Sequence, residues 1–154
     1  MSGLLLIARR LYERRYSGLI IPYKMVNPAH LEGECHQNAG LWARYNPGCK
    51  AVHGWMVFDH ERTSGGLVSI VQFNPHTIIE TDGGERFDVT PSQASRRYPF
   101  LDHEGPREHF IQLVEGNSLS VISYDPAADC CFSDRRALIR PVPIIRTKRG
   151  EGPT

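Results

Sequence analysis

Between residues 51 and 89 the sequence alternates strand-like runs with turns that are too short for a helical crossover between parallel strands. The runs are rich in Val, Ile, Phe and Thr, and we place strands at 51–58, 67–73, 76–81 and 86–89. Two neighbouring parallel strands need a crossover of about a dozen or more residues between them, and no interval here is that long. This segment therefore predicts an antiparallel sheet, which constrains the fold more than any other feature.

Helical segments are expected on either side of this sheet in the sequence. Apolar residues at helical spacing predict an amphipathic helix over 4–16, and a second helix runs from Cys35 to about Arg44, where Asn46-Pro47-Gly48 ends it. Further along we expect a short helix from Thr90, strands over 109–114 and 118–124, and a last helix over 133–139. Helices combined with hairpin-linked strands indicate the α+β class, with an antiparallel sheet and helices on one side of it.

At 154 residues, with 40% hydrophobic and 23% charged side chains, the chain has the size and balance of one globular domain. We assign this domain to 1–146 and expect 147–154 to be a flexible polar tail. A net charge of +1 gives no overall attraction to nucleic acid, and no apolar run approaches the roughly 20 residues that cross a membrane. We therefore expect neither nucleic acid nor membrane as a partner, and a cytoplasmic location. The sequence does not set the oligomeric state.

The four cysteines, Cys35, Cys49, Cys130 and Cys131, are too few for a disulfide scaffold in a chain of this length, and a reducing cytosol leaves them as thiols. Cys35 differs from the others because it opens a predicted helix after a polar loop at 27–34. The first turn of a helix has unpaired N–H groups and the positive end of the helix dipole, and both favour a thiolate. Cys35 is therefore the candidate nucleophile.

His76 and Asp88 lie on the two arms of one predicted hairpin and are candidates to activate that thiol. Side chains on a strand alternate between faces, so the length of the hairpin loop decides whether these two share one. A three-residue loop at Asp82-Gly83-Gly84 brings Asp88 opposite Ile78, which points to the same face as His76. This register predicts a triad of Cys35, His76 and Asp88.

The order of these motifs resembles the transglutaminase-like branch of the papain-like cysteine enzymes. The resemblance lies in Cys35 at a helix start, Ala51-Val52-His53-Gly54-Trp55 on a strand, His76-Thr77-Ile78-Ile79-Glu80, and Asp88-Val89-Thr90-Pro91. It implies a papain-like core in which Cys35 is the nucleophile, His76 the base and Asp88 the acid that orients the base. It also implies a hydrolase or acyltransferase that forms a thioester with a peptide or small acyl substrate and needs no cofactor.

Three further residues near this constellation have alternative or supporting roles. Asn38, one helical turn after Cys35, and Trp42, on the same helix face as Cys35, are the candidates to contact substrate. His53 is a rival base because it also follows Cys35 on a strand, but no carboxylate lies on a neighbouring hairpin arm at a comparable spacing. We therefore favour His76 as the base.

The sequence also leaves two other functions open. An inert module would keep the fold and use its cleft to hold a peptide. A metal site would draw on Cys35, His36, Cys49 and His53, but these lack the paired Cys-x-x-Cys or His-x-x-x-His spacing of closed zinc sites. We therefore expect no bound metal.

Overall fold

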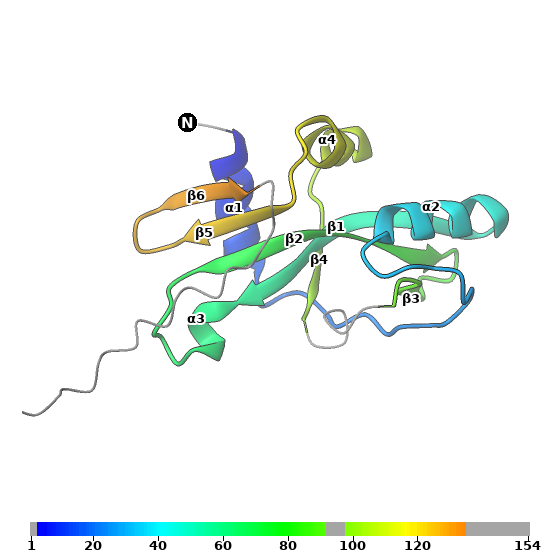
Figure 1. Ribbon diagram of the computed structural model, residues 1–154, viewed down its shortest axis with the longest axis horizontal. Helices are drawn as coiled ribbons and strands as arrows, with labels where there is room; N and C mark the ends of the chain where they lie inside the picture. The colour runs from blue at the N-terminus through cyan, green and yellow to red at the C-terminus, as the bar shows by residue number, and fades with distance from the viewer. Residues whose placement is uncertain (1–2, 92–97, 135–154) are drawn as a thin grey trace, which may run out of the picture.

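The computed structural model describes residues 3–91 and 98–134. Within them, one six-stranded antiparallel sheet has the order β4-β1-β2-β5-β6, and β3 pairs with β2 (Figure 1). The strands are β1 (Cys49–Asp59), β2 (Val71–Thr81), β3 (Arg86–Phe87), β4 (Phe100–Asp102), β5 (Val121–Asp125) and β6 (Cys130–Asp134). The helices are α1 (Gly3–Arg14), α2 (Cys35–Tyr45), α3 (His60–Thr63) and α4 (Arg107–Ile111). The expected α+β class with an antiparallel sheet is confirmed.

β1 and β2 form a long hairpin at the centre of the sheet. Each strand has 11 residues, and the two pair along their whole length. The expected break at Asn74-Pro75 was wrong, because β2 continues through Pro75, which lies opposite Trp55. On the side of β2 away from β1, β5 pairs only with 71–73 and β3 only with 79–80. Pro75 falls between them, so its missing N–H removes no bond to a described strand.

Helices cover one face of the sheet. Trp55 of β1 and Phe73 of β2 point to this face and pack against Leu11 of α1 and Phe110 of α4. α2 packs on the same face through Ala39, and Figure 1 shows α2 and α4 above the sheet. On the opposite face lies a smaller cluster of Ile21, Ile78 and Phe100, with Val52 partly buried against it. The segment between α1 and α2 therefore contributes to the cover of the second face through Ile21.

The segment 109–114, expected as a strand, is helical. α4 ends at Ile111, and a π-helical turn continues it over Gln112–Gly116. Phe110 is buried in the main core cluster, and Leu113 and Val114 pack against that cluster. This i, i+3, i+4 spacing suits a helix, but a short apolar run fits either structure by periodicity, which explains the error.

The end of the described chain also differs from expectation. β5 confirms most of the strand expected at 118–124, but Ser133 lies in β6, paired with Ile122, where a helix over 133–139 was expected. The prediction of a helix was therefore wrong at Ser133, its first residue. Residues 135–139 and the tail 147–154 lie outside the described residues, as does most of the short helix expected from Thr90.

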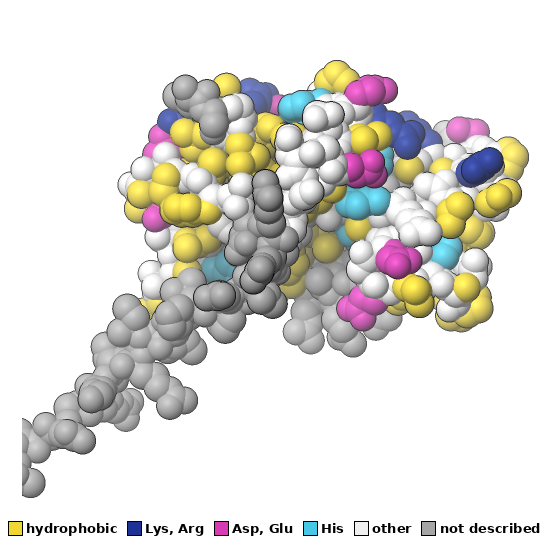
Figure 2. All heavy atoms as spheres, turned by 45° about the horizontal axis from the view of Figure 1, so that its top comes forward, with side chains coloured by type: hydrophobic (Ala, Val, Ile, Leu, Met, Phe, Trp, Pro, Cys, Tyr) yellow, Lys and Arg dark blue, Asp and Glu magenta, His cyan; other side chains and the backbone are white. Residues whose placement is uncertain are grey.

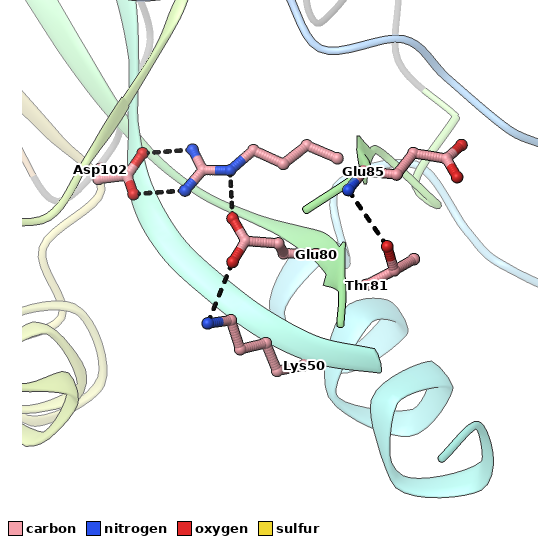
Figure 3. Close-up of polar contacts among 6 residues, drawn as sticks. Lys50, Glu80, Thr81, Glu85 and Asp102 are labelled. Carbon is pink, nitrogen blue, oxygen red and sulfur yellow. Dashed lines mark hydrogen bonds and ion pairs between the residues drawn. The ribbon is translucent and has the colours of Figure 1, made fainter. Parts of the chain in front are cut away.

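A chain of ion pairs crosses the sheet on the face opposite the helices. Arg86 of β3 donates two hydrogen bonds to Asp102 of β4, at 2.6 and 2.7 Å, and one to Glu80 of β2, at 2.5 Å. Lys50 of β1 lies 3.0 Å from the other oxygen of Glu80, so the network joins four strands (Figure 3). Hydrogen bonds from Arg86 hold the pKa values of Asp102 and Glu80 below their usual range. The network fixes β3, the strand that leads into Asp88.

Candidate active site

The thiol of Cys35 lies at the first position of α2. The residue is 8% exposed, and its N–H belongs to the helix start, where N–H groups have no partner within the helix. Burial raises the pKa of this thiol, but hydrogen bonds with His36 and His76 outweigh burial and lower it to about 6. The sulfur is therefore mainly a thiolate at neutral pH, which is its nucleophilic form.

His76 and Asp88 form a buried pair next to this sulfur. Nε2 of His76 and Oδ2 of Asp88 are 2.5 Å apart, and the two residues are 4% and 0% exposed. Oδ1 of Asp88 accepts a hydrogen bond from the N–H of Thr90 at 2.9 Å. The Asp88 backbone is also held, since its N–H donates to the carbonyl of Pro22 and its carbonyl accepts from the N–H of Lys24. These contacts fix the carboxylate, which in turn orients the His76 ring.

The hairpin between β2 and β3 has the register that the sequence predicted. The strands pair so that Asp88 comes into line with Ile78. Glu85 closes the three-residue loop: its carbonyl accepts from Thr81 N–H at 2.9 Å, and its N–H donates to Thr81 Oγ1 at 3.2 Å (Figure 3). Gly84 in the loop has a φ of 84°, a left-handed conformation that glycine adopts without strain. The predicted shared face of the two triad candidates on this hairpin is confirmed.

The charge state of His76 complements that of the thiol. Burial lowers the pKa of His76, but hydrogen bonds to Asp88 and Cys35 outweigh burial and raise it to about 10. Between about pH 6 and about pH 10 the ring is therefore a cation and the sulfur an anion. Below that window the sulfur gains a proton, and above it the ring loses one. This ion pair is the form in which a thiol attacks a carbonyl group and an imidazolium supplies the leaving group with a proton.

Cys35 and His76 meet at an open stretch of the β2 edge. α2 covers the face to which Ile79 points, whereas His76 points to the other face and packs edge-on against Phe100. On the side of β2 away from β1, no described strand pairs with residues 74–78. The sulfur at the start of α2 therefore reaches the imidazole past an edge that the described strands leave open.

A second histidine also contacts the thiol, and the sequence did not predict this role for it. His36 follows Cys35 in α2, and its side chain is, with His76, one of the two that lower the pKa of the thiol. Nδ1 of His36 is 2.5 Å from Oγ1 of Thr77, a fully buried residue of β2. Nδ1 of His53 reaches the same hydroxyl oxygen at 2.8 Å. His53 and Thr77 are direct partners across β1 and β2, a signal that becomes readable only once the register of these strands is known.

His53, the rival base, is a neutral ring, and Thr77 and His36 separate it from the thiol. It stacks on Phe110 with ring centroids 4.8 Å apart, and its hydrogen bond goes to Thr77. Burial and then the positive charge of Arg107 lower the pKa of His53 to about 4. The ring that contacts both the thiol and a carboxylate is His76.

Comparison with known proteins does not place the chain. No protein-family model matches it, and neither does any curated protein or solved structure. The transglutaminase-like resemblance therefore stays a prediction that depends on the residues themselves. Among the described residues, no helix has the length and apolar character needed to cross a membrane.

Asn38 and Trp42, the expected substrate-side residues, both have contacts within the protein. Asn38 is 4% exposed, and its Nδ2 donates to the carbonyl of Leu31 at 2.9 Å and to Oγ1 of Thr90 at 3.1 Å. It therefore ties α2 to the residue whose N–H holds Asp88. Trp42 packs against the buried cluster beneath α2. Both side chains support the position of α2, and a contact of either with substrate stays a prediction.

A pocket of about 220 Å³ opens next to His53. Residues 50–53 of β1 line one side of it, and Asp102, His103 and Arg107 line the other. Histidine side chains reach the surface near basic and acidic side chains on the face shown in Figure 2. The pocket adjoins His53, the histidine that shares the hydroxyl of Thr77 with His36.

The four residues considered as metal ligands do not come together in that role. Among the described residues, no group of three or more His, Cys, Asp or Glu side chains is arranged to hold a metal ion. Cys35, Cys49, Cys130 and Cys131 are all free thiols. His36 and His53 instead share the hydroxyl of Thr77, a neutral group that is a hydrogen-bonding partner for both rings.

Proposed function

We propose that the protein is a cysteine-dependent hydrolase or acyltransferase that acts through a thioester on an amide or ester, with a core of the papain-like, transglutaminase-like type. The observation that carries the proposal is the buried Asp88–His76 pair set against the sulfur of Cys35. A buried cysteine is ordinarily a small, inert hydrophobic residue. Here its pKa is lowered while that of its neighbour His76 is raised, and opposed shifts in touching groups are typical of functional sites.

In the first half of the reaction, the thiolate of Cys35 attacks the carbonyl carbon of the substrate and a carbon–sulfur bond forms. The carbonyl oxygen becomes an oxyanion, for which the N–H of Cys35 at the helix start is the natural first donor. His76 then gives its proton to the leaving amine or alcohol as the carbon–nitrogen or carbon–oxygen bond breaks. A thioester on Cys35 and a neutral His76 are left.

In the second half, water or an amine attacks the thioester, and His76 takes the proton of the attacking group. The carbon–sulfur bond breaks, the acid or new amide leaves, and the thiolate–imidazolium pair is restored. Asp88 keeps one ring nitrogen of His76 occupied throughout, so the ring presents the other to the reacting groups. The protein side chains account for every proton, and the cycle needs no cofactor.

The limited exposure of the thiol favours a narrow substrate. With Cys35 8% exposed, an extended peptide or a small acyl group reaches the sulfur more readily than a bulky folded surface. A thiol that works as a thiolate must also stay reduced, which suits the cytoplasm. We therefore propose a peptide or small acyl substrate in a reducing compartment.

The test is to trap the acyl-enzyme. The full chain is mixed with p-nitrophenyl acetate at pH 7, and nitrophenolate release is followed together with the intact mass and the acetylated peptide. We expect a stoichiometric burst and an acetyl group on the Cys35 peptide, because this thiolate predominates at that pH.

The matched variants are Cys35→Ala and Cys49→Ala. The first should lose the burst, while the second, which removes a free thiol away from the His76–Asp88 pair, should keep it. A burst that survives in Cys35→Ala, or acetyl groups spread evenly over the four cysteines, would show that the proposed function is wrong.

A further inference from the structure

The pocket beside His53 has no part in the mechanism above, yet two basic side chains, Lys50 and Arg107, line it. We propose that this pocket binds a carboxylate group of the acyl substrate, with Arg107 as the cation that anchors it. The proposal names a substrate class for the thiol site and therefore rests on the proposed function. Binding of a carboxylate, however, can be measured without any reaction.

The pocket lies at an edge of the sheet that the described strands leave open. β4 pairs with β1 only along 54–56, so residues 50–53 have no described strand on that side. After β4, the N–H of His103 bonds to the carbonyl of His53 at 3.0 Å, and Arg107 follows at the start of α4. The hollow between them, about 220 Å³, is smaller than the roughly 300–1,000 Å³ of sites for drug-sized ligands. It therefore suits one small group of a longer substrate.

The charges around the pocket leave Arg107 as its uncompensated cation. Asp102 accepts two hydrogen bonds from Arg86, and Lys50 pairs with Glu80. Arg107 is exposed, and no acidic side chain in the described part of the chain pairs with it. A single guanidinium matches a carboxylate, which is a monoanion and binds its fork with both oxygens. A phosphate monoester, with a charge of about −1.5 to −2 at neutral pH, fits this balance less well.

His53 gives a second sign that a partner is missing here. Its Nδ1 bonds to Thr77, whereas its Nε2 is buried and has no hydrogen-bond partner among the described residues. A buried polar atom without a partner is uncommon in native structures and needs an explanation. The charge of Arg107 acts on this ring, because it is, after burial, the main cause of the low pKa of His53. An anion held by Arg107 would offset that charge, and its oxygens can supply the partner of Nε2.

The rings of His36 and His53 connect the pocket with the thiol. Their centroids are 6.2 Å apart, and both rings hydrogen-bond Thr77. His36 follows Cys35 directly, and its side chain is among the causes that lower the pKa values of both Cys35 and His53. Both rings are half-buried, so a substrate can lie over their exposed edges. The substrate must span more than 6.2 Å between its reacting carbonyl and its carboxylate, which is about two extended residues.

Binding is tested with sodium acetate and the full chain labelled with ¹⁵N at histidine, near pH 6. We expect a saturable shift of the His53 ring signals with acetate and none with sodium chloride at equal ionic strength. Arg107→Gln should abolish this shift. Arg62→Gln, which removes an exposed arginine of α3 beyond the other end of β1, should keep it. Without acetate, Arg107→Gln should raise the pKa of His53 above about 4, while burial holds it below its ordinary value.

Two results of the binding test would overturn the proposal. One is the absence of a saturable shift with acetate, or the same shift in the wild-type chain and in Arg107→Gln. The other is tighter binding of inorganic phosphate than of acetate, which would make the pocket a phosphate site. An unchanged pKa of His53 in Arg107→Gln would also count against the proposal, because the guanidinium would then not act on the ring.

The substrate test compares acyl donors that differ in one charge. The mono-4-nitrophenyl esters of adipic, suberic and sebacic acid are set against the same esters with the free carboxylate methylated, and the acyl burst at pH 7 is the readout. For the longer chains we expect the free acid to acylate Cys35 about tenfold faster than its methyl ester, as a hydrogen bond between charged groups supports. Arg107→Gln should remove this preference, and Arg62→Gln should retain it.

The two tests separate this proposal from the proposed function. If an acyl-enzyme forms but acid and methyl ester react equally at all three chain lengths, the role of Arg107 is wrong and the thiol chemistry stands. If acetate binds through Arg107 but no acyl-enzyme forms with any ester, the proposed function is wrong. The pocket is then a carboxylate site, and its assignment to an acyl substrate fails together with the thioester chemistry.

Discussion

His53 on β1 and His76 on β2 are almost opposite each other, offset by one residue along the paired strands. Their pKa values nevertheless move in opposite directions. Thr77, the neighbour of His76, is the partner of His53. Burial lowers the pKa of both rings, but His76 has the carboxylate of Asp88 and the thiol of Cys35 and ends at about 10. His53 has a hydroxyl partner and a nearby cation and ends at about 4. Burial alone thus makes a histidine neutral, and an anionic partner decides which ring can serve as an acid.

Among the variants that test this comparison, His76→Ala should have the largest effect on the reactivity of Cys35. Without its cation the pKa of Cys35 rises towards the free-thiol value of about 8.5, so alkylation by iodoacetamide at pH 6 should fall about a hundredfold. In the wild-type chain, alkylation of Cys35 should rise through about pH 6 and stay high as pH increases, because the thiolate exists above that value. Peptide mapping compares Cys35 with the other three cysteines.

The outcome that would contradict this assignment is equally direct. If Cys35 is alkylated no faster than Cys49, Cys130 or Cys131 in the wild-type chain at pH 6, then Cys35 is not a thiolate there. The lower pKa described for it would then be wrong, and the nucleophile assignment would fail with it.

Asp88→Asn should have an intermediate effect on the thiolate and a larger one on turnover. An amide keeps an acceptor for Thr90 but cannot pair with a charged ring, so the pKa of His76 should fall and alkylation at pH 6 should drop about tenfold. Because the pKa of His76 is raised on folding, ring protonation stabilises the folded state below its ordinary pKa, and this contribution disappears as pH rises through about 10. The loss of Tm in Asp88→Asn should therefore be greater near neutral pH than at pH 10. A constant difference over that range would argue against the ion pair.

The smallest effect is expected for His53→Ala. The change removes one partner of Thr77 but leaves the hydroxyl able to donate to His36, so alkylation of Cys35 at pH 6 should change by less than about threefold. The same iodoacetamide assay measures it beside His76→Ala. Loss of reactivity in His53→Ala together with its survival in His76→Ala would reverse the roles of the two rings.

The local part of the site could be predicted from the sequence. The β2–β3 register follows from side-chain alternation and the three-residue loop, both of which are properties of a few neighbouring residues. The start of α2 at Cys35 was also predicted, because Asn46-Pro47-Gly48 and the preceding polar loop delimit the helix.

The rest depends on contacts between distant segments. Pro75 looked like a strand end, and it is tolerated because of where β3 and β5 stop along β2. The run around Phe110 reads as a strand until its packing on Trp55 is known. The contact of His36 with Thr77 requires the placement of α2 over β2, which no short pattern in the sequence determines.

The ion pairs that fix β3 also have a consequence for the order in which the molecule assembles. β3 has two residues, and its Arg86 reaches Asp102 on β4, while the backbone of Asp88 is held by Pro22 and Lys24. The hairpin itself closes a short loop, but these partners lie far away along the chain and carry a larger loop-closure entropy. The carboxylate is therefore fully anchored only when β4 and the segment around Pro22 and Lys24 have both docked. A nascent chain thus carries an ordinary, weakly reactive thiol, and its cysteine acquires its ion-pair partner as the sheet is completed.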